Sequence, residues 1–231
     1  MKRQIASLAV LLASTPCLGH FVFIAPSAEK GEFQVVFSEE PVPDEKVAID
    51  KIIETRLLSV DANGKASKLD WARDEHALRG TLPEPKPVIL AGVTDYGWVQ
   101  SKHTGNIPVL LKYYSKAVLG DIRTLPEVQL GREMPFEIIP KVVDGSLTLV
   151  ALQNGKPLKD ATCAVQAPGE EKAAMGKTDS EGRIAGKLDR PGRYAVKVKA
   201  VEDKPGEWKG QKYDKEHLWA TLVFDLSPVN P

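Results

Sequence analysis

Short hydrophobic runs alternate with polar segments that contain Pro and Gly along most of the chain. Runs of four to eight residues with a period of two are typical of β-strands. Asn63-Gly64 separates two such runs, and Asn-Gly predicts a tight hairpin because both residues tolerate positive φ. The pattern predicts an all-β protein of sandwich or barrel type. The predicted strands are 21–24, 33–37, 57–60, 66–71, 76–82, 88–91, 96–100, 109–114, 127–130, 136–139, 146–153, 161–167, 192–198 and 218–226.

One segment favours a helix. Acidic residues follow Pro43, and Ile49, Ile52 and Ile53 recur at spacings of three and four residues. Proline and acids suit the first turn of a helix, so the sequence predicts a short helix over 44–54.

The strand pattern restarts after residues 140–145, which divides the chain near residue 142. We therefore expect two β-sandwich-like domains, 20–141 with the short helix and 142–231. The polar stretch 201–216 is expected to form a long exposed hairpin loop.

The N-terminus has the features of an export signal. Lys2 and Arg3 precede an apolar run, 5–13, that is too short to span a bilayer as a helix. Cleavage after Gly19 leaves Cys17 and Gly19 at the two positions that require small residues. The sequence predicts a signal peptide over 1–19, a mature chain that begins at His20, and a periplasmic or secreted protein.

Two other ways of processing fit less well. Cleavage after Ser14 would place the bulkier Leu12 at one of the small-residue positions. Lipid attachment at Cys17 is disfavoured by Pro16, because a small residue is needed there.

Composition excludes several classes of function. The chain has 31 basic and 31 acidic residues and no basic block, which argues against nucleic acid as a partner. No second apolar run is long enough for a membrane span after the signal is removed. Cys163 is the one cysteine of the mature chain, so it forms no internal disulfide, and its alternating apolar neighbours indicate a buried small residue.

Catalytic signatures are also missing from the sequence. It has no Gly-rich phosphate loop, no HExxH, no CxxC and no Gly-x-Ser-x-Gly elbow. This favours a protein that is not an enzyme.

The chain contains four histidines, and the first of them would open the mature chain. An N-terminal histidine chelates a metal ion with its α-amine and imidazole Nδ1, whose protons a metal displaces near neutral pH. Nitrogen donors suit Cu(II) best, then Ni(II) or Zn(II). We predict a metal site at His20 that either His217 or His103 completes, with Asp95 and Tyr96 as further candidates for its lining. His76 lies among charged residues and is expected to be solvated.

Several motifs carry resemblances to known families. The turns at 154–158, 178–183 and 191–194 make the second half similar to prealbumin-like and carboxypeptidase-regulatory-like β-sandwiches. The mature chain also resembles an exported bacterial family of unknown function that is often labelled a periplasmic component of nickel or cobalt uptake. That resemblance rests on these segments: 20–23 with Pro26, 37–41, 95–97, 110–116 and 217–222. It implies a secreted two-domain β protein with a role in handling a metal such as nickel or cobalt.

Three functional hypotheses follow. The first is a periplasmic metal carrier, chaperone or uptake accessory, with a transition-metal ion and an envelope transporter or other surface protein as partners. The second is a metal-free module that docks on an envelope protein or a glycan. The third is a copper-dependent oxidative enzyme, which needs an open metal position beside a substrate groove.

Overall fold

The computed structural model describes residues 19–27, 29–84, 86–125, 128–143 and 146–228. These residues are mainly in β-strands, and the helical elements among them are short 3-10 turns. The predicted all-β class is therefore confirmed. The predicted signal peptide lies outside the described residues, except for Gly19 at its end.

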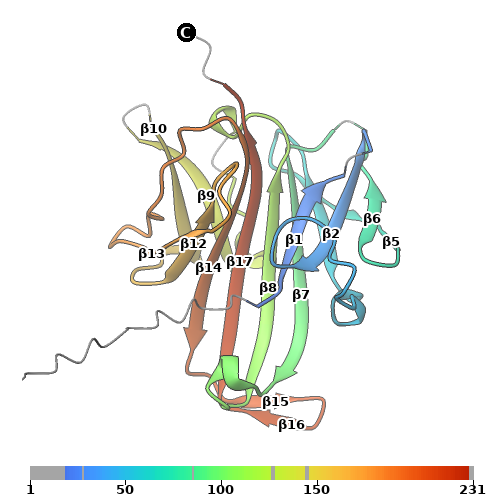
Figure 1. Ribbon diagram of the computed structural model, residues 1–231, viewed down its shortest axis with the longest axis vertical. Coiled ribbons are helices and arrows are strands. Elements are labelled where there is room, and N and C mark those ends of the chain that lie inside the picture. Colours follow the sequence, from blue (N-terminus) through green and yellow to red (C-terminus); the bar gives the residue numbers. More distant parts are fainter. Residues whose placement is uncertain (1–18, 28, 85, 126–127, 144–145, 229–231) are drawn as a thin grey trace, which may run out of the picture.

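An eight-stranded sheet extends through most of the molecule (Figure 1). Its strands follow the order β13-β12-β14-β17-β8-β7-β3-β4, and all neighbours are antiparallel except β17 and β8, which are parallel. Their bounds are β3 (Arg56–Val60), β4 (Ala66–Leu69), β7 (Ile89–Val99), β8 (Val109–Val118), β12 (Thr162–Gln166), β13 (Ala174–Lys177), β14 (Gly192–Glu202) and β17 (Lys215–Leu226). The β17–β8 pair joins strands of the two predicted domains in one sheet.

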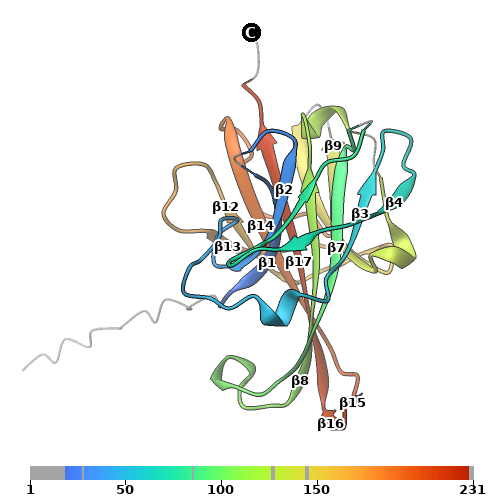
Figure 2. The same ribbon diagram turned by 90° about the vertical axis from the view of Figure 1, so that its right-hand side faces the viewer.

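A four-stranded sheet covers one face of the large sheet, in the order β1-β2-β6-β5. Its strands are β1 (Phe21–Pro26), β2 (Glu32–Ser38), β5 (Ala72–Arg73) and β6 (Leu78–Thr81). Figures 1 and 2 show β1 lying against β8 and β17. The side chains of Phe21 to Ala25 are at most 2% exposed. The hydroxyls of Ser115 and Thr221 both donate to the carbonyl of Val22, at 2.8 and 2.7 Å, which attaches β1 to the large sheet.

A three-stranded sheet packs on the opposite face. It consists of β9 (Phe136–Val143), β10 (Ser146–Gln153) and β11 (Lys156–Pro157). Lys116 of β8 forms an ion pair of 2.5 Å with Glu137 of β9, and both side chains are almost completely buried. This pair links the two layers within an otherwise apolar core.

Alternation along β17 explains how one strand supplies two cores. Leu218, Ala220 and Leu222 belong to the core beneath β9 and β10, whereas Val223 belongs to the core beneath β1 and Trp219 packs against it. Successive side chains of a strand point to opposite faces, so a strand between two covering layers is apolar on both.

The far end of the large sheet forms an extended arm. The predicted loop 201–216 contains a small hairpin there, formed by β15 (Gly206–Trp208) and β16 (Gln211–Tyr213). Both views place it at the end of β7, β8 and β17, away from β1 (Figures 1 and 2).

The predicted helix over 44–54 is wrong in extent. The segment contains only the 3-10 turn η1 (Asp50–Ile52), and Ile53 is exposed while Ile49 and Ile52 are buried. The side chain of Asp44 accepts a hydrogen bond from the backbone N–H of Lys46, a local bond that competes with helix formation.

Other predicted boundaries also shift. The two strands predicted at 88–91 and 96–100 form one strand, β7, with a bulge between Asp95 and Gly97. No strand forms over 128–130, and residue 127 lies outside the described residues. The remaining 3-10 turns are η2 (Lys102–Thr104), η3 (Ile122–Thr124) and η4 (Gly131–Glu133). The domain boundary predicted near 142 falls within β9, and the division into two domains stays a prediction.

Candidate metal centre

His20 directly precedes β1, and its main chain is held in place by the large sheet. The hydroxyl of Tyr113 on β8 donates to the carbonyl of His20 at 3.1 Å. The next residues, Phe21 and Val22, are at most 2% exposed. A residue in this position is anchored on its C-terminal side by a buried strand.

The imidazole of His20 is oriented by two neighbours. Its Nε2 lies 3.4 Å from Oδ2 of Asp44, and its ring centroid lies 5.6 Å from that of Phe37. The hydrogen bond from the Lys46 N–H, together with His20 itself, holds the pKa of Asp44 below its ordinary value, so this carboxyl is ionised at neutral pH. Among the described residues, Nδ1 of His20 has no hydrogen-bond partner.

This arrangement matches what an N-terminal chelate requires of the ring. A carboxylate beside Nε2 favours the tautomer with the proton on Nε2, which leaves the lone pair of Nδ1 for a metal. The same nitrogen is the one that closes a chelate ring with an α-amine. Sequence reasoning missed Asp44, because it placed this residue in a helix; its position three residues after Pro41 gave no indication of the contact.

His217 projects from the face of the large sheet that carries β1. It shares its side of β17 with Trp219, whose ring lies 4.7 Å from that of Phe21. Partial burial, with Lys199 and Lys215 nearby, lowers the pKa of His217 from 6.5 to about 4. The imidazole is therefore neutral at pH 7, the form that binds a metal ion.

The structure thus places His20 and His217 on the same face of the large sheet. His103 lies in the exposed turn η2, between β7 and β8, where Ser101 and Thr104 form reciprocal capping hydrogen bonds. This turn curls toward the side of the sheet on which β1 lies (Figure 2). The choice between His217 and His103 as the completing ligand stays a prediction.

Of the two further residues proposed to line the site, Tyr96 lies near His20 and Asp95 is engaged elsewhere. Tyr96 belongs to the surroundings of His20, since its ring lies 5.3 Å from that of Phe37 and 5.7 Å from that of Tyr113. Burial raises the pKa of both tyrosines, which keeps their hydroxyls protonated. Asp95 instead pairs with Arg56 at 3.0 Å.

His76 is remote from this cluster. It lies between β5 and β6, two strands away from β1, with its Nε2 3.6 Å from a carboxylate oxygen of Glu75. Its side chain is half-buried, at 29% exposed, and the expectation that it is only a solvated residue stays a prediction.

No group of three or more His, Cys, Asp or Glu side chains within the described part of the chain is arranged to hold a metal ion. A chelate formed by the amine and imidazole of a single residue does not need such a group. The predicted site consequently depends on the α-amine that cleavage after Gly19 would create.

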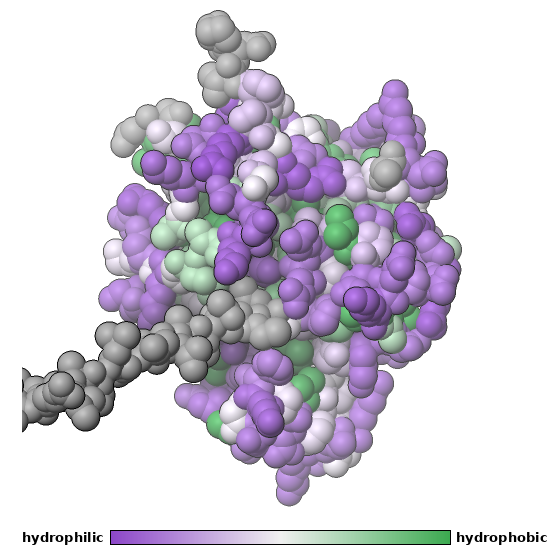
Figure 3. Space-filling model, viewed as in Figure 1, coloured by the Kyte–Doolittle hydropathy of each residue, from purple (hydrophilic) through white to green (hydrophobic). Residues whose placement is uncertain are grey.

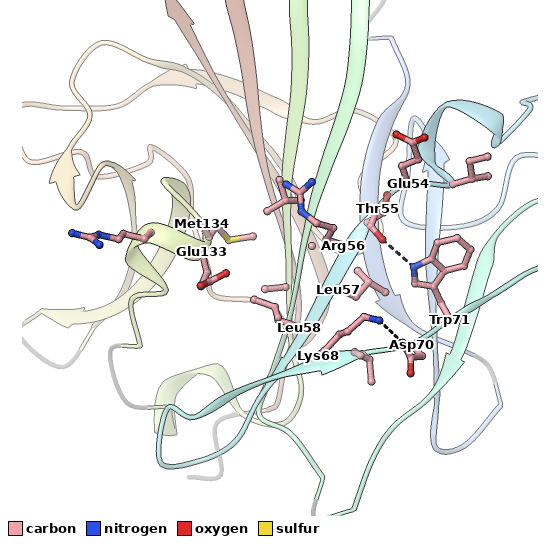
Figure 4. A pocket seen from close by; sticks show the side chains of 16 residues that line it. Glu54, Thr55, Arg56, Leu57, Leu58, Lys68, Asp70, Trp71, Glu133 and Met134 are labelled. Carbon is pink, nitrogen blue, oxygen red and sulfur yellow. Dashed lines mark hydrogen bonds and ion pairs between the residues drawn. The ribbon is translucent and has the colours of Figure 1, made fainter. Parts of the chain in front are cut away.

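A groove of about 610 Å³ lies elsewhere, at the edge formed by β3 and β4 (Figure 4). The close-up shows the indole of Trp71 donating to the carbonyl of Thr55, and Lys68 paired with Asp70. None of the four histidines lines this groove. It therefore offers no nitrogen donors from imidazole.

The chain matches no protein-family model and no curated protein sequence. None of the helical segments that the structure describes has the length and apolar character needed to cross a membrane.

Proposed function

We propose that this protein is exported to the cell envelope and binds a transition-metal ion, Cu(II) or Ni(II), through the α-amine and Nδ1 of His20. Cobalt is a weaker candidate on the same donors. His217 or His103 adds a further imidazole nitrogen. The protein then acts as a metal carrier, chaperone or uptake accessory.

The contact between Nε2 of His20 and Asp44 is the observation that carries the proposal. It orients Nδ1 for chelation and supplies the carboxylate partner that metal-binding histidines commonly have. The Tyr113 hydrogen bond to the His20 carbonyl supports the same geometry, because it limits the motion of the main chain beside the amine.

The surface on this side offers little support for a metal-free module that docks on another protein. Hydrophilic side chains cover most of the face seen in Figure 3, and hydrophobic ones show only in small groups. Protein-binding surfaces more often expose a contiguous apolar patch. The module hypothesis therefore ranks second.

The test is to purify the protein from an exporting host, sequence its N-terminus and titrate it with Cu(II) under EPR. We expect the mature chain to begin at His20 and to give the spectrum of a nitrogen-coordinated Cu(II) site. His20→Ala should abolish that site, whereas the matched control His76→Ala should bind as the parent does.

The variant Asp44→Ala, in the same Cu(II) titration, tests the role of the carboxylate beside His20. Loss of the carboxylate partner should weaken Cu(II) binding by about 10–100-fold without removing the site. An N-terminus at another residue, or equal Cu(II) binding by the parent and His20→Ala, would contradict the proposal.

A further inference from the structure

A second pocket, of about 230 Å³, lies along the outer end of β7. β3 pairs with β7 only from Ile89 to Val93. Beyond that point no strand among the described residues pairs with β7 on the side away from β8. The pocket is lined instead by the η1 segment and by the β15–β16 hairpin, which lie beside the end of β7 (Figure 1).

Three partly exposed aromatic side chains line this pocket: Tyr96, Trp98 and Trp208. Trp98 is held by the hydrogen bond of 2.9 Å from its indole N–H to the carbonyl of Lys212. Trp208 lies against Gly97, so closely that a Cβ at residue 97 would be 3.2 Å from the indole nitrogen. Gly97 also has a φ of 108°, next to the bulge. The bulge and this glycine therefore allow the indole to lie against the main chain of β7.

The polar groups around the aromatic side chains carry both signs of charge. Asp95 pairs with Arg56 at 3.0 Å, and Asp50 pairs with Arg73 at 2.7 Å. Lys51 and Lys209 also line the pocket, with their Nζ atoms 5.9 and 5.7 Å from the ring centroids of Tyr96 and Trp208, and the remaining polar lining side chains are those of Glu54 and Gln211. The rim consequently offers hydrogen-bond donors and acceptors without one dominant charge, which suits a neutral ligand better than an ion.

We propose that this pocket binds one neutral pyranose ring of a glycan. A pyranose has apolar C–H faces that pack on aromatic rings, and a rim of hydroxyls that both donate and accept hydrogen bonds. Aromatic walls with a few convergent polar groups are the usual composition of a small-ligand site. The volume is below the roughly 300–1,000 Å³ of pockets for drug-sized ligands, so it accommodates a single ring.

An extended peptide added to the β7 edge is the main competing ligand, and two features oppose it. The bulge between Asp95 and Gly97 distorts the strand at this edge, and Gly97 has a φ of 108°, outside the extended region that a paired strand adopts. Bulges of this kind prevent strand addition at sheet edges.

The proposal is independent of metal binding, and its test uses the metal-free mature protein. Saturation-transfer NMR and tryptophan fluorescence are recorded with glucose, N-acetylglucosamine and their β-linked tetramers as probes. We expect saturation transfer to the ring protons of at least one probe, and a change in fluorescence that saturates.

Two variants locate the site. Trp208→Ala should weaken binding at least about tenfold, and Gly97→Ala should do the same by displacing the indole. Trp71→Phe, a change outside the pocket, should bind as the parent does, and urea unfolding checks that each variant is folded. Absence of transfer to all four probes, or binding that Trp208→Ala leaves unchanged, would overturn the proposal.

Discussion

His20 and Asp44 lie 24 positions apart in sequence and meet through their side chains at the edge of β1. This contact decides which imidazole nitrogen is available to bind a metal ion, because the carboxylate lies beside Nε2 and leaves Nδ1 without a partner in the described part of the chain. A residue-level property, the tautomer, thus depends on a contact between distant parts of the chain.

His217 gives the protein a defined response to acid. Its pKa falls from 6.5 in the unfolded chain to about 4 in the folded protein, chiefly because burial disfavours the charged ring. The folded state therefore binds this proton less readily than the unfolded state does. The contribution of His217 to stability is complete above pH 6.5 and is lost as the pH falls from 6.5 to about 4.

We expect His217→Gln to reduce the loss of stability between pH 6.5 and 4 in EDTA-treated protein. Urea unfolding at several pH values measures the free energy of unfolding for the parent and the variant. Parallel pH curves for the two proteins would show that His217 remains solvated in the folded state.

At the scale of elements, the buried pair Lys116–Glu137 joins β8 to β9. Burial lowers the pKa of Lys116, and Glu137 opposes that shift by stabilising the charged ammonium. Glu137 also accepts a hydrogen bond of 3.1 Å from the backbone N–H of Leu130, which attaches the segment before η4 to the same pair.

Removing one partner of this pair should cost more stability than removing both. We expect Lys116→Met to destabilise the protein by about 3–5 kcal/mol, because it leaves the Glu137 carboxylate buried without a counter-charge. The double variant Lys116→Met, Glu137→Leu should recover most of that loss. The free energy of unfolding in urea measures both, and a double variant less stable than Lys116→Met would contradict this account.

The elements themselves show where sequence patterns are reliable. The runs at 21–24 and 146–153 are apolar or alternating over their whole length, and β1 and β10 contain them. The helix over 44–54 was predicted from the isoleucine spacing and from Pro43 with the acidic residues after it, whereas only one 3-10 turn forms and the carboxylate of Asp44 accepts from the N–H of Lys46. Local competition of this type has no signature in hydrophobic periodicity.

At the scale of the whole molecule, the parallel pairing of β17 with β8 brings the last strand beside a strand of the first half. The β17 and β8 strands together form the floor on which β1 packs. Neither half of the chain supplies this floor alone, so the site around His20 requires both.

We therefore expect residues 20–231 to unfold in one cooperative transition. Tryptophan fluorescence and far-UV circular dichroism should give coincident curves in urea, since Trp71 and Trp98 lie in one half and Trp208 and Trp219 in the other. Two separated transitions would instead support the predicted division near residue 142.

The sequence by itself determined the all-β class and most strand positions, because side-chain alternation is a local property that folding preserves. It also singled out His20, on the pattern of the export signal, and Asp95-Tyr96-Gly97, on resemblance alone. Only the tertiary structure decided that Asp44 faces the His20 ring, that His217 lies on the same face, and that Trp208 lies against Gly97. The two contacts, His20 with Asp44 and Gly97 with Trp208, join residues separated by 24 and 111 positions along the chain. Their formation depends on strand order and packing, which the hydrophobic pattern does not encode.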